Sequence, residues 1–483
     1  MTNQEIVQKL WNLCNVLRDD GITYHQYVNE LTFILFLKMA EETGTDTLVP
    51  PQYRWKNLAA SQIDNLERYK LYKQILVDLG SDDTRGIVYD IYKDAYTNIR
   101  KPIHLEDIIL KIDGIDWYTH DKEDLGDMYE GLLEKNATEV KSGAGQYFTP
   151  RPLIDTMVEL IDPQLGEYCN DPASGTFGFM VSAARYVKKR HNEADLDNEQ
   201  IIFQKKKAFS GCELVADTHR LALMNALLHD LEPDNLLLGD TLSDEIGPRM
   251  KNYDVVLSNP PFGTKKGGER TKRNDITFPT SNKQLNFLQH IYRSLKADGK
   301  ARAAVVLPDN VLTADNDGSK VRKDLMKKCN LHTILRLPTG IFYAQGVKTN
   351  VLFFSREAKE SDKNTPSVWF YDMRTNMDSF GKRTPFTRTH FDNFVNAYRA
   401  TDRHAVQDER WSCITAEQIA TKEYSLDFGL IRDENLIDHE ELPEPTEIAQ
   451  AALDALESAS ENIRRILQRL ETHSVLHQNR EGV

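Results

Sequence analysis

The 483-residue chain is poor in cysteine and lacks the common metal and phosphate motifs. Its five cysteines are scattered and form no CxxC pair, which favours a reducing compartment and argues against disulfides or structural zinc. No HExxH sequence occurs, so no metal is expected. Walker and GxGxxG loops are also absent, which disfavours a pyrophosphate cofactor and a nicotinamide dehydrogenase.

Long apolar runs are missing as well. The first five residues carry no signal-like pattern, and the apolar run at 33–37 is far too short to span a bilayer. That run is better interpreted as part of a buried helix. These absences predict a cytoplasmic protein without membrane contact.

Positive charge is in deficit overall but concentrated at one place. The net charge of −14 disfavours nucleic acid, because phosphate contacts supply most nonspecific affinity. The segment 265–273 is nevertheless strongly basic, and two glycines interrupt it. A charged run is often only a solvated surface, but this one directly follows the residues Asn-Pro-Pro-Phe at 259–262, so a loop that contacts nucleic-acid phosphates is an equally good interpretation. The candidate residues are Lys265, Lys266, Arg270, Lys272 and Arg273.

Three regions of different character follow one another along the chain. Residues 1–138 show helical periodicity and predict a helical domain. Residues 139–428 alternate short apolar runs with helical patterns, as βαβ units around a parallel sheet do, with further strands expected at 303–307, 332–337 and 351–354. Residues 429–483 contain a heptad seam, which predicts a partner-binding helix or, alternatively, a helix packed on its own domain. The seam residues are Ala452, Leu456, Ala459, Ile463, Ile466 and Leu470.

The most informative motif follows the apolar run 253–258 and consists of Asn259, Pro260, Pro261 and Phe262. Two prolines end a strand, and ligands bind at the carboxyl ends of strands in open α/β sheets. An amide oxygen, a proline carbonyl and a flat ring suit the exocyclic amine of an aromatic base. Asn-Pro-Pro by itself is equally a common turn.

Three other strand ends carry candidate ligand groups. Asp171 opens the loop Asp-Pro-Ala-Ser-Gly-Thr-Phe-Gly, whose glycines allow close approach of a ligand before a helix begins near Phe177. Glu213 and Asp240 end the next two strands, where carboxylates can accept hydrogen bonds from ribose hydroxyls and from an adenine amino group. Each acid could instead cap a helix. Upstream, Thr149 is a natural N-cap with Pro150 at the first helical position, and such a helix start can bind a carboxylate.

The loop, the strand-end acids and Asn-Pro-Pro-Phe, in this order, resemble amino-methylating DNA methyltransferases that use S-adenosylmethionine. The stretch Gly-Gln-Tyr-Phe-Thr-Pro-Arg at 145–151 and the segment 337–342 are similar to the modification subunit of type I restriction–modification systems. The resemblance covers nearly the whole chain. It implies an α/β fold: a Rossmann-like methyltransferase sheet with an N-terminal helical domain and a C-terminal coiled-coil-like helix. It also implies methylation of N6 of an adenine in double-stranded DNA.

The resemblance implies a role for each motif. Asn259, Pro260, Pro261 and Phe262 would bind and stack the target base, with Phe342 as a looser match on its other side. Glu213 would hold the ribose of the cofactor and Asp240 its adenine. The segments that would line the rest of the cofactor, chiefly its methionine end, are Gln146, Tyr147, Phe148, Thr149, Pro150, Arg151, Asp171, Ser174, Gly175 and Thr176.

No large segment for reading a DNA sequence follows the catalytic region. In the family a separate specificity subunit does this, which fits the heptad helix, and a second copy of the chain and a restriction/motor subunit complete the complex. Two other interpretations stay open. One is a stand-alone methyltransferase for cytosine N4, RNA or protein glutamine, and the other is a noncatalytic assembly subunit.

Overall fold

The structure, a computed structural model, describes residues 2–18, 21–81, 86–117, 122–139, 149–263, 273–342, 348–377, 380, 384–428 and 431. The chain divides into two compact units, 1–431 and 432–483. The second unit, which holds the predicted heptad helix, lies outside the described residues. The same applies to Gln146, Tyr147, Phe148, Lys265, Lys266, Arg270 and Lys272.

The N-terminal part is helical, as its periodicity predicts. Its described residues form no strand, and capping boxes that start at Thr2, Thr23 and Asp64 set three of the helix beginnings. The apolar run at 33–37 is buried within α3, which confirms its interpretation as a buried helix segment. The helices are α1 (Asn3–Asn12), α2 (Cys14–Arg18), α3 (Tyr24–Glu42), α4 (Trp55–Leu58), α5 (Asn65–Leu79), α6 (Ile87–Tyr92), α7 (Pro102–Asp113) and α8 (Lys122–Glu139).

A nine-stranded sheet in the order β3-β2-β1-β4-β5-β7-β6-β8-β9 forms the centre of the rest. β1 lies between β2 and β4, so the strand order reverses at β1, and the strands from β3 to β5 are all parallel. All the predicted strands are present, and β8 and β9 are additional to them. The strands are β1 (Cys169–Asp171), β2 (Phe209–Glu213), β3 (Leu236–Leu238), β4 (Val255–Ser258), β5 (Arg302–Pro308), β6 (Cys329–Arg336), β7 (Thr349–Arg356), β8 (Ser367–Asp372) and β9 (Trp411–Thr415).

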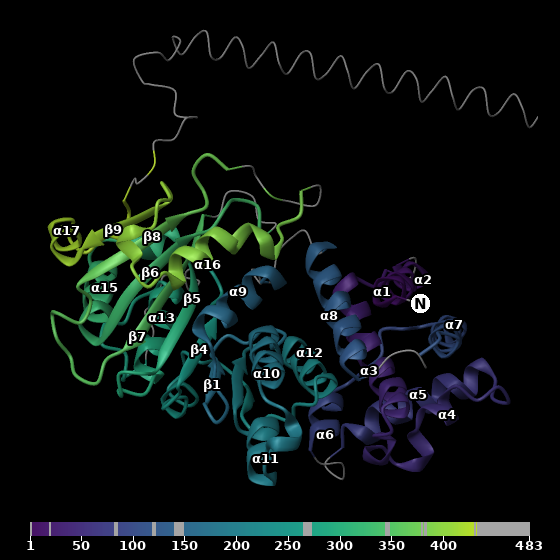
Figure 1. The fold of residues 1–483 in the computed structure, drawn as a ribbon. Coiled ribbons are helices and arrows are strands. Elements are labelled where there is room, and N and C mark those ends of the chain that lie inside the picture. The colour runs from purple at the N-terminus through teal and green to yellow at the C-terminus, as the bar shows by residue number, and fades with distance from the viewer. Residues whose placement is uncertain are drawn as a thin grey trace, which may run out of the picture. The chain divides into compact units, whose positions relative to one another are not determined.

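Helices cover both faces of the sheet. Val255 and Leu257 of β4 face one hydrophobic core, whereas Val256 between them faces the other, because side chains alternate along a strand. On the first face α12 also packs against α3, α6 and α8, which joins the helical part to the sheet (Figure 1). The helices are α9 (Arg151–Ile161), α10 (Gly178–Arg190), α11 (Asn198–Lys206), α12 (Ala216–Leu228), α13 (Lys283–Ser294), α14 (Asp309–Thr313), α15 (Asp317–Lys328), α16 (Asp392–Arg399) and α17 (Ala416–Thr421).

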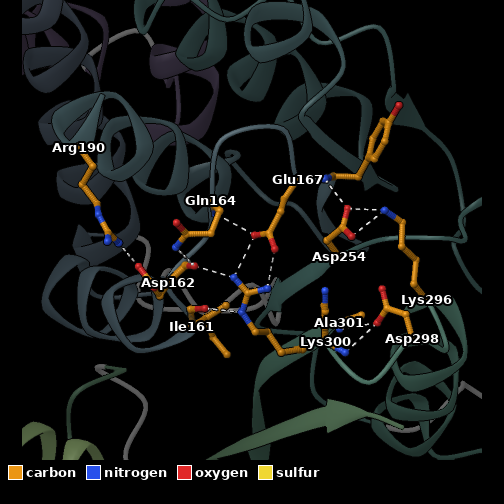
Figure 2. Close-up of polar contacts among 12 residues, drawn as sticks. Ile161, Asp162, Gln164, Glu167, Arg190, Asp254, Lys296, Asp298, Lys300 and Ala301 are labelled. Atoms are coloured by element: carbon orange, nitrogen blue, oxygen red, sulfur yellow. Dashed lines mark hydrogen bonds and ion pairs between the residues drawn. The ribbon is translucent and has the colours of Figure 1, made fainter. Parts of the chain in front are cut away.

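A polar network ties the chain together at the amino-terminal edge of β4 and β5 (Figure 2). Arg302, the first residue of β5, donates to both Glu167 oxygens at 2.8 and 2.9 Å and to the carbonyls of Ile161 and Asp162. Lys296 bonds Asp254, just before β4, at 2.6 Å. These contacts hold the segment between α9 and β1 against the ends at which β4 and β5 begin.

One predicted helix start is wrong by one residue. The structure begins α9 at Arg151, with Pro150 rather than Thr149 as the N-cap residue. The Thr149 hydroxyl makes no cap bond and instead accepts a hydrogen bond from Asn259, 110 residues away. A tertiary contact has therefore replaced the expected local one. Separately, no helix in the described part of the chain is long and apolar enough to cross a bilayer.

Candidate active site

Four strand ends meet at one edge of the sheet. Asp171 ends β1, Glu213 ends β2, Asp240 follows β3 by two residues, and Asn259 directly follows β4. Because these strands are parallel and adjacent, their carboxyl ends face the same side. The order of β1 and its neighbours places the glycine loop at the point where the strand order reverses, the usual ligand crevice of such sheets.

The glycine loop after β1 is held against the end of β2. Gly175 has a φ of +51°, and Phe177, the N-cap residue of α10, has a φ of +69°. The Gly175 amide donates to Glu213 Oε2 at 3.0 Å, while Glu213 Oε1 accepts from the Val215 amide at 2.9 Å. Burial raises the pKa of Glu213. Each carboxylate oxygen can accept one more hydrogen bond, so Glu213 can hold the loop and a ligand hydroxyl together.

Asp171 lies beneath the loop and is almost completely buried, at 1% exposed. Its Oδ1 accepts from the Ser258 hydroxyl at 2.7 Å and from the Ala173 amide at 3.0 Å. Burial raises the pKa of Asp171 to about 7, with a further increase from the charge of Glu213. Asp171 thus connects the glycine loop to the residue before Asn259, which is a supporting position rather than an exposed one.

Exposed apolar side chains lie beside the acids of the site, although the sequence motifs do not single them out. Leu214 and Val215, which follow Glu213, are 63% and 39% exposed. Leu238, the register partner of Glu213 on β3, is 48% exposed, and Asp240 lies two residues beyond it with a bond to the Leu242 amide at 2.8 Å. Branched apolar residues at strand ends are the signal that could have identified them, because they offer a flat apolar surface beside polar groups.

The tip after β4 is fixed from several directions. Asn259 Nδ2 donates to Thr149 Oγ1 at 3.0 Å. This bond turns the carbonyl side of the amide away from Thr149. The Pro261 carbonyl accepts from Gln284 of α13 at 3.2 Å, and Phe262 is partly buried against the large core. The tip is therefore a rigid acceptor-bearing turn, as its two prolines predict.

Ser174 Oγ in the glycine loop and Arg151 Nη1 at the start of α9 are among the buried polar atoms that lack a hydrogen-bond partner in the described part of the chain. Arg151 Nη2 pairs with Glu130 of α8, which leaves its other terminal nitrogen for a different acceptor. Buried polar atoms are rarely left unpaired, so this pair is suited to a polar, carboxylate-bearing ligand. The residues present therefore fit the methionine end of S-adenosylmethionine.

Arg273 and Phe342, which the sequence also suggests as ligand contacts, are buried by packing within the fold. Arg273 is 3% exposed and donates to the Thr241 carbonyl, to His290 and to Asp275, so it is a structural arginine and not an exposed phosphate contact. Phe342 is 7% exposed and packs within the large hydrophobic core. Its suggested stacking role stays a prediction.

Comparison with known proteins places these features in context. A family model described as N-6 DNA Methylase matches residues 120–440, and one described as the HsdM N-terminal domain matches residues 6–112. The StySPI methylase subunit of a type I restriction enzyme from Salmonella potsdam is 45% identical over 97% of this chain and 96% of its own length. The EcoKI methylase subunit from Escherichia coli K12 shows the same identity and coverage.

Solved structures agree in fold. The crystal structure of the EcoKI M protein is 40% identical, covers 96% of both chains and superposes with a TM-score of 0.55. A structure described as showing complex assembly and conformational transition of the type I R-M system is 27% identical, covers 98% of this chain and 99% of that chain, and has a TM-score of 0.74.

Proposed function

The chain belongs to the N-6 DNA methylase family and, within it, to the methylase subunits of type I restriction enzymes; from this premise we propose that it methylates N6 of an adenine flipped out of DNA, with S-adenosylmethionine as the methyl donor. The bond between Asn259 and Thr149 carries the proposal. It orients the amide so that Oδ1 is the acceptor presented to a target amine.

The chain's own groups would act chiefly by positioning. Asn259 Oδ1 and the Pro260 carbonyl would accept the two N6 hydrogens, which aims the nitrogen lone pair at the methyl donor. Phe262 would stack on the base and offset part of the unstacking cost, by about 1–3 kcal/mol. Positioning of this kind can supply about 7–11 kcal/mol in favourable cases. No strong base is required beforehand, because the amine nitrogen becomes acidic as it takes up the methyl group and then releases its proton to water.

The cofactor would lie across the glycine loop. Glu213 would bind the ribose hydroxyls and Asp240 the adenine amino group, beside the exposed side chain of Leu214. Arg151 Nη1 and Ser174 Oγ, both buried without a partner in the described structure, would bind the methionine carboxylate and its surroundings. When bound, S-adenosylmethionine supplies the transferable methyl group.

Asn259→Ala tests the assignment of the amine site. Methyl transfer to DNA, followed with radiolabelled donor, should fall at least about a hundredfold, since one positioned hydrogen-bonding group is worth this much in comparable sites. Calorimetry should show unchanged cofactor affinity. Glu213→Ala is the matched counterpart, because cofactor affinity should fall while the amine site is intact. Retained activity in Asn259→Ala contradicts the proposal, and so does preferential methylation of RNA or protein in parallel assays.

Partner binding is the other half of the proposal. The relative described as part of a type I complex supports assembly with further subunits, and residues 432–483, with their heptad seam, would bind a separate DNA specificity subunit. A second copy of the chain and a restriction/motor subunit would join the same complex. Deletion of residues 432–483 should abolish co-purification of the specificity subunit and leave cofactor binding intact. Undiminished co-purification would assign the contact to the first unit.

Binding of DNA phosphates is proposed for the loop after Asn-Pro-Pro-Phe. Replacing Lys265, Lys266, Arg270 and Lys272 by Gln should flatten the salt dependence of DNA binding by the complex. The log–log slope should change by about 0.9 for each phosphate that these side chains neutralise in the unmodified protein. Arg273 is left out of this set because its donors bond within the fold. An unchanged slope would show that the loop lies away from DNA.

A further inference from the structure

Glu130 of α8 belongs to the N-terminal helical part, yet its carboxylate contacts two segments of the candidate active site. Oε2 forms an ion pair with Arg151, the first residue of α9. Oε1 accepts from Asn225 Nδ2 of α12 at 3.4 Å. The same Asn225 nitrogen donates to the Thr176 carbonyl in the glycine loop at 2.9 Å. One carboxylate, whose side chain is 11% exposed, is thus connected to both segments that would line the methionine end of the cofactor.

Arg151 depends on this contact for its direction. Its Nη2 is paired with Glu130, and its Nη1 is buried with no partner in the described part of the chain. A guanidinium presents its donors in a rigid planar fork, so fixing one terminal nitrogen also fixes where the other points. Without Glu130 the charge would be drawn toward the other nearby acids, Asp155 and Asp127.

A metal site is the competing interpretation of this cluster. Ligand atoms of Asp127, Glu130 and His229 lie within 4.8 Å of one another. However, Arg185 pairs with Asp127 at 2.6 Å and Arg151 pairs with Glu130, so a positive charge already faces each carboxylate. Ion pairing within the protein therefore accounts for both carboxylates of the cluster without a cation.

We propose that Glu130 is a positioning residue through which the helical domain holds Arg151 toward the carboxylate of the methyl donor. The inference rests on the proposed function, because it needs S-adenosylmethionine to lie across the glycine loop. It assigns the helical domain a direct part in forming the cofactor pocket, in addition to any role in assembly. Asn225, which bonds both Glu130 and the Thr176 carbonyl, extends the same support to the glycine loop.

Glu130→Gln tests the proposal, since glutamine keeps the shape and removes the charge. In the isolated chain, calorimetry should show the dissociation constant for S-adenosylmethionine rising about tenfold, a typical coupling between residues in direct contact. In the assembled complex, KM for the donor should rise similarly while kcat at saturation stays within about twofold. Glu134→Gln is the matched control, because Glu134 is an exposed glutamate one turn further along α8. It should leave both constants unchanged.

A double-mutant cycle with Arg151→Ala separates positioning from general damage to the fold. If Glu130 acts through Arg151, then Glu130→Gln should change affinity by less than about twofold in the Arg151→Ala background. Fully additive effects, or unaltered affinity in Glu130→Gln, would overturn the proposal. Failure of the underlying function looks different: the unmodified chain would not bind the donor at all, or Glu213→Ala would bind it normally.

Discussion

Asp171 should make the stability of this protein decrease as the pH rises toward neutrality. Its carboxyl is 1% exposed and lies near Glu213, and burial raises its pKa from an ordinary value of 3.8 to about 7. The folded chain therefore keeps the proton over a range in which the unfolded chain has released it. The stabilisation that Asp171 contributes is fully present below about pH 4 and is lost as the pH rises through about 7.

The size of the effect follows from the difference between the two pKa values. At 1.36 kcal/mol per pKa unit, moving from 3.8 to about 7 corresponds to ~4 kcal/mol between the low-pH and high-pH limits. Asp171→Asn removes the ionisation but keeps an oxygen that can accept from Ser258 and the Ala173 amide. The free energy of unfolding of the variant, relative to that of the unmodified protein, should increase by up to ~4 kcal/mol as the pH rises from about 4 to 8.

Urea denaturation of both proteins at a series of pH values measures this difference. The informative quantity is how the difference in free energy of unfolding between the two proteins changes with pH, because every other titrating group is shared by both. Asp195→Asn, at an exposed aspartate, is the control and should give parallel curves. The reasoning is refuted if Asp171→Asn also runs parallel to the unmodified protein between about pH 5 and pH 8.

Two substitutions test the contacts that surround the tip. Thr149→Val keeps the shape but removes the hydroxyl that accepts from Asn259, so kcat should fall by about 5- to 160-fold, equivalent to ~1–3 kcal/mol, with cofactor affinity unchanged. A normal kcat would show that the amide needs no such support. Arg273→Ala leaves the Thr241 carbonyl and Asp275 without their donor and should lower the free energy of unfolding by ~3–5 kcal/mol. The salt dependence of DNA binding should not change. A changed salt dependence with normal stability would show that Arg273 contacts DNA after all.

The local sequence is sufficient to predict those parts of the site whose residues follow one another in the chain. Asn-Pro-Pro-Phe ends a strand because its prolines cannot continue a ladder, and the loop containing Gly175 turns where a positive φ is needed. The alternation of apolar runs and helices predicted the parallel strands, and parallel strands bring their carboxyl ends to one edge. The strands β8 and β9 are not indicated by the sequence, because β9 mixes apolar and polar residues and neither strand has the run of aliphatic residues that marks β5.

Tertiary structure alone decided which of these groups support one another. The contacts Thr149–Asn259 and Asp171–Ser258 join residues 110 and 87 positions apart, and no local pattern encodes such a separation. The sequence therefore determined where chemistry-bearing residues stand along the chain and which strand ends carry them. Packing determined that Thr149 orients an amide instead of capping a helix, because a side chain's partner is whichever group the folded chain brings within hydrogen-bonding distance.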